Sequence, residues 1–415
     1  MKVSLKWLNQ VVDLSGITPE EIAHKLTFAG IEVEGYAPIA MGSNLVIGQI
    51  LKVDKHPESE HLSVLQVDEG EKFGIHQIIC GAPNVREGMK VIVALPGCKL
   101  PALTISQSKI RGVLSDGMCC ALNELGVDPK FLLESQVAGI EELPEDAPIG
   151  RQDVLTYLGL DDVVLDLKLL ANRSDCLSVY NVAQELGGLF MRPVKALKSA
   201  SHRQVTPSPV TVKSLTDKNP LFAIKTLRGI KVGPSPKYLQ NLLMASGIRS
   251  INNIVDIGNY IMLLTGQPLH MYDLDKLPSY NFVIRDDLKR DWVALDEKHY
   301  DVLPGDIAIT VNDDIMCLGG VMGSLSSAVD ASTKNIAIEA AYFDQATVRK
   351  TATRLNLVSE SSQRFAKGIN PHQTSLVLEL AADLIQQLCG SHEEQEIIKD
   401  DRVIHQRKLI ASSVS

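Results

Sequence analysis

The chain has few of the features that mark membrane, zinc or nucleotide sites. No apolar run reaches 18 residues, so no segment has the length of a transmembrane helix. The seven cysteines form no C-x-x-C pair and no H-E-x-x-H is present, which argues against zinc and against a metal-dependent hydrolase. No P-loop occurs, and no G-x-G-x-x-G follows a predicted strand. The start, MKVSLKWLNQ, lacks a signal-peptide pattern, so we expect a cytoplasmic chain with reduced thiols.

Positive charge is also scarce. The net charge is −9 over 415 residues, which excludes a general nucleic-acid coat or a binder of anionic membranes. Any nucleic acid would have to be held by a local basic patch. The length predicts two to four domains, and 45% hydrophobic with 22% charged residues is typical of globular proteins.

Residues 41–150 have the pattern of a small β-barrel. Short β-type runs alternate with Gly, Pro and Asn turns, which is typical of an OB-fold of five strands. The predicted strands are Val46–Val53, Leu62–Asp68, Gln77–Cys80, Lys90–Leu95 and Thr104–Ile110.

Particular residues make this segment resemble the tRNA-binding OB module of some aminoacyl-tRNA synthetases and of free tRNA-binding proteins. The matching positions include His56-Pro57, Cys80-Gly81-Ala82, Arg111-Gly112 and Ser115-Asp116-Gly117-Met118. The residues expected to contact tRNA are Lys109, Arg111, Asn84 and Ser115. Residues 41–127 nevertheless contain eight Lys and Arg against nine Asp and Glu, whereas a module that neutralises several phosphates should be basic. The barrel is therefore interpreted as a weak or assisted tRNA contact, or as one retained for packing.

The segments on either side of the barrel read as one discontinuous α/β domain, 1–40 plus 151–195. Thr18, Pro19 and Glu21 give the capping-box start of a helix that ends near Gly30. Val163–Leu169 reads as a strand and Val179–Phe190 as a helix. A basic, Ser- and Pro-containing linker, 191–209, follows.

Residues 210–395 form the largest predicted domain, of mixed α/β character. Helices are predicted after Pro236, over Asn252–Thr265, over Asp344–Leu357 and from Asn370 to Gly390. Four strands are predicted: Phe282–Arg285, Ile307–Val311, Ile315–Leu318 and Ile336–Glu339. Residues 396–415 are expected to begin a further domain that is truncated here. The fold class is multidomain α+β.

Motifs in three regions, taken together, resemble the N-terminal half of bacterial phenylalanyl-tRNA synthetase β subunits. Five motifs occur in the order found in that family. They are the chain's start KVSLKWLNQVVDL, the segment Asn172-Arg173-Ser174-Asp175-Cys176-Leu177-Ser178, then Gly266-Gln267-Pro268-Leu269-His270, Gly319-Gly320-Val321-Met322-Gly323, and Arg364-Phe365 with Lys367-Gly368. The resemblance implies that 41–150 is the tRNA-binding OB-fold domain and 210–395 an editing domain of the B3/B4 type. It also implies that this chain lacks the family's catalytic-like core and anticodon-binding domains.

The resemblance further implies a ligase subunit that binds tRNA(Phe) and proofreads mischarged Tyr-tRNA(Phe) by ester hydrolysis. The partner would be the α subunit, in an α2β2 assembly, with no membrane involved. No cofactor or metal is expected in this chain, whereas ATP and Mg²⁺ are implied for the complete enzyme. We do not expect this chain to aminoacylate by itself.

Two residues are predicted to carry the editing chemistry. Glu339 ends the apolar run Ile336–Ile338, where a carboxylate is out of place in a plain core strand. The residues alone favour a glutamate that faces solvent at the end of a strand. His270 follows a Gly-Gln-Pro turn and could orient a water, or could be an ordinary surface histidine. By resemblance, these are the phenol-recognising glutamate and the editing-site histidine.

Further residues are expected to shape the substrate pocket. The predicted set is Gly319, Gly320, Gly323, Ser359, Ser361 and Asn253. The glycines would let backbone approach a ligand, although a plain hairpin would also use them. The serines are expected on the loop after the Asp344–Leu357 helix, and the plainer interpretation of Asn253 is helix capping. The competing hypothesis for the whole chain is a non-enzymatic tRNA-binding and assembly module.

Overall fold

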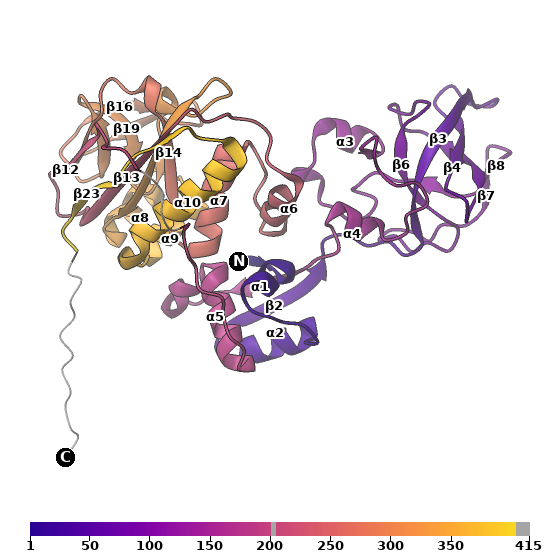
Figure 1. The fold of residues 1–415 in the computed structure, drawn as a ribbon, viewed down its shortest axis with the longest axis horizontal. Helices are drawn as coiled ribbons and strands as arrows, with labels where there is room; N and C mark the ends of the chain where they lie inside the picture. The colour runs from indigo at the N-terminus through magenta and orange to yellow at the C-terminus, as the bar shows by residue number, and fades with distance from the viewer. Residues whose placement is uncertain (201–204, 404–415) are drawn as a thin grey trace, which may run out of the picture.

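The computed structural model describes residues 1–200 and 205–403. Figure 1 shows a β-barrel set apart from two other units that lie against each other, one built on a small sheet and one on two larger sheets. None of the described helices is long and apolar enough to cross a membrane.

A three-stranded antiparallel sheet joins the two ends of the N-terminal region. Its order is β1-β11-β2, so a strand from after the barrel, Val163–Lys168, lies between Lys2–Ser4 and Glu32–Pro38. Helices α1 (Leu5–Val11), α2 (Pro19–Phe28) and α5 (Val179–Phe190) belong to this unit. The chain therefore leaves this sheet, builds the barrel and returns.

The start of α2 confirms the capping box predicted at Thr18. The Thr18 side chain accepts from Glu21 N, and the Glu21 carboxylate accepts from Thr18 N. Ile22 and Leu26 are buried, whereas Phe28 is 82% exposed. The buried face of the helix thus ends at Leu26, two residues before its last apolar residue.

The barrel strands are joined in the order β10-β6-β3-β4-β5, with β9 pairing β6. Their bounds are β3 Leu45–Lys55, β4 Ser63–Asp68, β5 Ile75–Cys80, β6 Lys90–Ala94, β9 Met118–Cys119 and β10 Glu142–Leu143. The helices η1 (Pro129–Phe131) and α3 (Glu134–Ala138) lie between β9 and β10 in the chain, and α4 (Val154–Leu158) follows β10.

The prediction of a fifth barrel strand over Thr104–Ile110 is wrong. Only Ser108–Ile110 (β7) is a strand, and it pairs with β8 (Val113–Ser115) in a separate hairpin. The segment 115–119 closes the barrel instead: Asp116 N donates to Gln77 O of β5 while Cys119 pairs with Val93 of β6. The apolar alternation misleads here because most of 104–110 is exposed.

The third unit contains two sheets. One has the order β14-β21-β13-β22 with β23 also on β13, and the other has the order β12-β15-β18-β19-β20. The strands of the first are β13 Leu221–Arg228, β14 Leu269–Asp273, β21 Asn335–Tyr342, β22 Glu393–Glu394 and β23 Ile398–Asp401. Those of the second are β12 Thr211–Ser214, β15 Asn281–Arg285, β18 Ala308–Val311, β19 Asp314–Leu318 and β20 Met322–Gly323.

Five helices and one hairpin complete this unit. They are α6 Lys237–Ala245, α7 Asn253–Thr265, α8 Gln345–Leu355, α9 Glu360–Lys367, α10 Thr374–Cys389 and the hairpin of β16 (Arg290–Val293) with β17 (His299–Val302). The 3-10 turns of this unit are η3 Leu274–Lys276, η4 Leu325–Ser327 and η5 Pro371–Gln373, whereas η2 Ala171–Cys176 lies between β11 and α5 of the N-terminal unit. Gly266 ends α7 in the left-handed conformation, as its position predicts.

The sheet that contains β21 separates two hydrophobic cores. Ile336, Ile338 and Ala340 lie in a core with α7 and α10, whereas Ala337 and Ala341 lie in a core with the second sheet. The first core also contains Trp7 and other N-terminal residues, and the Trp7 ring stacks on Tyr260 of α7 with centroids 4.7 Å apart. The N-terminal unit and the two-sheet unit therefore share one core.

The C-terminal end of the described chain extends the first sheet. The sequence places residues 396–415 at the start of a following domain, yet β23 within that stretch pairs antiparallel with β13. Residues 404–415 lie outside the described residues.

Candidate functional site

A cavity of about 280 Å³ lies in the two-sheet unit and brings six of the predicted site residues together. It is lined by residues of α7, β14, β19, β20, β21 and α9 and their loops: Asn259, Pro268, Leu269, His270, Leu295, Cys317, Gly320, Val321, Met322, Gly323, Glu339, Ser359, Ser361 and Phe365. Among the described residues that line it, the ionisable side chains are Glu339, His270 and the Cys317 thiol.

Glu339 reaches the cavity because of strand alternation. Successive side chains point to opposite faces, so Glu339 shares the face of Ala337 and Ala341, toward the second sheet. The strand continues beyond Glu339 to Tyr342, so the carboxylate is in mid-strand and only 4% exposed, not at a strand end. The Tyr272 hydroxyl donates a hydrogen bond to its Oε2. Burial raises the pKa of Glu339 to about 7, and the Tyr272 bond partly opposes this.

His270 lies directly opposite Glu339 across the β14–β21 ladder. The sequence predicted a loop histidine, but the residue after the Gly-Gln-Pro turn already belongs to β14. Its ring meets the Tyr272 ring edge-on, with centroids 4.5 Å apart. Burial lowers the pKa of His270 to about 4, so the imidazole is neutral at physiological pH. A neutral ring can both donate and accept a hydrogen bond.

Glycine at 323 makes room for the histidine. A Cβ at Gly323 would lie 2.3 Å from Cε1 of His270 and 2.7 Å from its Nε2. Gly320 has φ +72° and would place a Cβ 2.9 Å from the Phe365 ring. Gly319 does not line the cavity, contrary to prediction: a Cβ there would press on Ile307 and Phe343 in the core.

The two predicted serines line the cavity from the start of a helix that the sequence did not reveal. Ser359 is the N-cap of α9, accepting from Ser362 N while Ser362 Oγ accepts from Ser359 N. Ser361 lies in the first turn of α9. The expected loop is therefore a capped helix end, which fixes both serines against the cavity.

Asn253 does not line this cavity, and it does not cap α7 either: the N-cap is Asn252, whose Oδ1 accepts from Ile254 N and Val255 N. The Oδ1 of Asn253 accepts from Gly233 N and its Nδ2 donates to Lys231 O, which fastens the start of α7 to the loop between β13 and α6. Asn259, one turn and a half further along α7, lines the cavity instead. Sequence reasoning missed it, although a lone amide in the apolar middle of a helix was an available signal.

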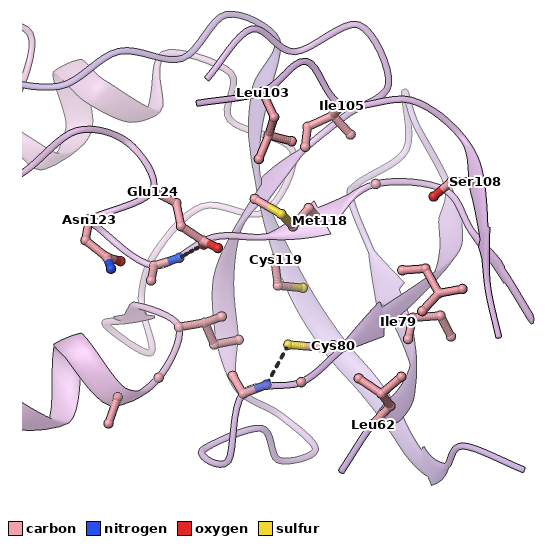
Figure 2. A pocket seen from close by; sticks show the side chains of 18 of the residues that line it. Leu62, Ile79, Cys80, Leu103, Ile105, Ser108, Met118, Cys119, Asn123 and Glu124 are labelled. Carbon is pink, nitrogen blue, oxygen red and sulfur yellow. Dashed lines mark hydrogen bonds between the residues drawn. The ribbon is translucent and has the colours of Figure 1, made fainter. Parts of the chain in front are cut away.

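A second hollow, of about 540 Å³, opens on the barrel (Figure 2). Most of its lining residues are apolar or small, with Leu62, Ile79, Leu103, Ile105 and Met118 among them, and Asn123 and Glu124 add polar groups. The described residues that line it include no Lys, Arg or aromatic ring. The one carboxylate among these lining residues is that of Glu124 (Figure 2), whose Oε2 accepts a hydrogen bond from Ala121 N at 2.7 Å. Such walls offer neither phosphate neutralisation nor base stacking.

The predicted tRNA-contacting residues divide into two pairs. Lys109 and Arg111 are exposed on the β7–β8 hairpin, where Arg111 has φ +46° and donates to Glu58 O. Asn84 and Ser115 are engaged within the barrel. Asn84 bonds both the N–H and the C=O of Ile140, and buried Ser115 accepts from Ile79 N and donates to Gly117 O.

Comparison with known proteins identifies both regions. Residues 218–390 match the family described as "B3/4 domain", and residues 45–152 match the one described as "Putative tRNA binding domain". The first match covers most of the two-sheet unit and the second covers the barrel, and these two units carry the two hollows described above.

Relatives match nearly the whole chain. A phenylalanine–tRNA ligase β subunit of Streptococcus thermophilus is 43% identical over 395 residues, which is 94% of this chain and 49% of the relative. One from Bacillus cereus is 40% identical over 417 residues, 99% of this chain and 52% of the relative. A solved N-terminal fragment of the Pyrococcus horikoshii phenylalanyl-tRNA synthetase β subunit covers 60% of this chain and 72% of its own, at 14% identity and TM-score 0.33. The chain belongs to the family of phenylalanine–tRNA ligase β subunits and spans about half the length of the curated relatives it matches.

Proposed function

We propose that this chain binds tRNA(Phe) and hydrolyses mischarged Tyr-tRNA(Phe) in the cavity between Glu339 and His270. The observation that carries the proposal is a buried carboxylate in a cavity whose other lining side chains are apolar or neutral. Buried glutamates are rare unless they are paired, and strongly perturbed titratable groups gather at functional sites.

The selectivity of such a site follows from its polarity. An apolar pocket made for phenylalanine rejects tyrosine by only about 100-fold, because tyrosine merely adds a hydroxyl. A site built to hydrogen-bond that hydroxyl rejects the analogue without it by roughly 10⁴- to 10⁵-fold. Glu339 is the acceptor that a substrate phenol would need.

The remaining residues support positioning of the ester. A neutral His270 can hold a water or the terminal ribose without placing a second charge beside Glu339. Gly320 and Gly323 leave backbone free of side chains at the cavity wall. We assign no residue as the general base, and the terminal ribose hydroxyl of the substrate can itself assist the attack.

The larger activity is proposed for the complete enzyme. There the β subunit would support aminoacylation of tRNA(Phe) with the α subunit, in an α2β2 assembly in the cytoplasm. ATP and Mg²⁺ would serve that reaction. The described residues contain no group of three or more His, Cys, Asp or Glu that could hold a metal.

The test is deacylation of preformed Tyr-tRNA(Phe) and Phe-tRNA(Phe) by the purified chain. We expect selective loss of tyrosine, and Glu339→Gln should reduce the tyrosine rate about 100-fold or more while leaving the slow phenylalanine rate unchanged. Glu71→Gln, an exposed carboxylate of the barrel, is the matched control.

Two other outcomes would contradict the proposal. Equal hydrolysis of both esters would remove Glu339 as a phenol acceptor. No hydrolysis with the chain in excess, but retained tRNA binding that Lys109 and Arg111 support, would favour the non-enzymatic tRNA-binding and assembly module.

A further inference from the structure

Tyr272 holds the recognition carboxylate from inside the protein. It is fully buried, lies two residues after His270 on β14 and does not line the cavity. Its hydroxyl donates to Oε2 of Glu339. Within the described residues this is the only hydrogen bond that the Glu339 carboxylate makes. The other oxygen, Oε1, therefore has no protein donor, and the side chain forms part of the cavity wall.

The Tyr272 ring is held on two sides. The His270 ring meets it edge-on at 4.5 Å, and the Phe282 ring packs against it at 5.4 Å between centroids. Because the ring belongs to the core of the second sheet, a phenylalanine would fill the same space. Ring packing alone accounts for an aromatic side chain at this position but not for its hydroxyl. A buried phenol hydroxyl needs a hydrogen-bond partner, which Glu339 provides.

We propose that Tyr272 is a positioning residue for tyrosine discrimination: its hydroxyl fixes Glu339 through Oε2 and so presents Oε1 to a substrate phenol. This inference rests on the proposed function. The chain's own phenol and the substrate's phenol would share one carboxylate, one oxygen each.

The Tyr272 hydroxyl helps to stabilise the ionised form of the Glu339 carboxyl, because few other groups around Glu339 can do so. The titratable groups packed around the carboxylate are Tyr272, the Cys317 thiol and His270, which is neutral at physiological pH. No cation of the described residues compensates for burial. The Tyr272 bond is thus what favours the ionised, accepting form, and charge-assisted hydrogen bonds are the stronger ones.

The test compares Tyr272→Phe with the parent chain on both aminoacyl-tRNAs between pH 5.5 and 8, after subtraction of spontaneous hydrolysis. We expect the ratio of the tyrosine rate to the phenylalanine rate to fall by about tenfold at pH 7. We also expect the pH midpoint of that ratio to move upward. Tyr300→Phe is the matched control, because Tyr300 also donates to a carboxylate, that of Asp296, but on the exposed β16–β17 hairpin.

A purely structural role would slow both esters equally and leave the midpoint in place, which would overturn the proposal. A second measurement is independent of hydrolysis. The Glu339 carboxyl pKa, read by ¹³C NMR against Glu339→Gln, should be higher in Tyr272→Phe than in the parent. If the parent chain hydrolyses neither ester, the proposed function fails, and an unchanged Glu339 pKa would overturn the role of Tyr272 separately.

Discussion

Glu339 and His270 are direct partners across the β14–β21 ladder, and both contribute to the wall of one cavity. Neighbouring strands lie about 4.8 Å apart, so a carboxylate and an imidazole at paired positions can contact one small substrate. Both titrate far from their usual values, Glu339 upward and His270 downward, and burial is the main cause of each shift.

Glu339 should make the folding stability of the chain depend on pH. Its folded pKa is about 7 against an ordinary value of 4.5, so stability falls as the pH rises from about 4.5 to about 7. The shift corresponds to about 3 kcal/mol. Glu339→Gln should therefore gain stability relative to the parent between pH 5 and pH 7.5, measured by urea unfolding. An equal difference at both pH values would contradict the assigned shift.

His270 should contribute to hydrolysis in its neutral form. His270→Ala should lower Tyr-tRNA(Phe) hydrolysis by about 100-fold through loss of positioning. In the parent chain, protonation of His270 should not limit the rate between pH 7 and pH 5, because its pKa is about 4. Any loss of tyrosine selectivity in that range should instead disappear with Glu339→Gln. A pH step that persists in that variant would assign the titration to another group.

Gly323→Ala should disturb the site through His270. The added Cβ would lie 2.3 Å from the ring, so the ring must move, at a cost of about 1–3 kcal/mol. We expect a large loss of hydrolysis, with part of the lost stability recovered in Gly323→Ala combined with His270→Ala. Gly188→Ala on α5 has open space and serves as the control. Full activity of Gly323→Ala would show that the ring position is unimportant.

Replacing Lys109 or Arg111 should weaken tRNA binding and leave the stability of the barrel unchanged. Each removed phosphate contact should reduce the slope of log affinity against log salt by about 0.7–0.9. The measurement is filter binding of tRNA at several salt concentrations for Lys109→Ala and Arg111→Gln, with exposed Lys334→Ala as the control. An unchanged slope in both variants would show that the β7–β8 hairpin does not contact the tRNA phosphates.

Replacing Ser115 should lower the stability of the barrel, and any effect on ligand binding should follow from that loss of stability. Its hydroxyl bonds Ile79 N and Gly117 O in the segment that closes the barrel, so Ser115→Ala should lose about 1–2 kcal/mol of stability. Ser106→Ala, at an exposed position nearby, should be close to neutral. Chemical denaturation of both variants checks this, and equal stabilities would mean that the hydroxyl is dispensable for closure.

Local signals in the sequence determined many individual elements. The capping box at Thr18 and Glu21 starts α2, Gly266 ends α7, and the apolar run before Glu339 marks a strand with a misplaced carboxylate. These features depend on residues within a few positions of one another, where backbone propensity and capping bonds decide the outcome.

Only the tertiary structure decided which distant residues meet. The sequence predicted a barrel strand at Thr104–Ile110, but the closing contacts come from 115–119, because strand pairing depends on a partner elsewhere in the chain. Tyr272 has no local signal as a functional residue, since it reads as one more aromatic core position. The strand register places Tyr272 beside the carboxylate of Glu339, 67 positions later in the chain. Burial strengthens the effect of this hydrogen bond, because a buried polar group without a partner is costly.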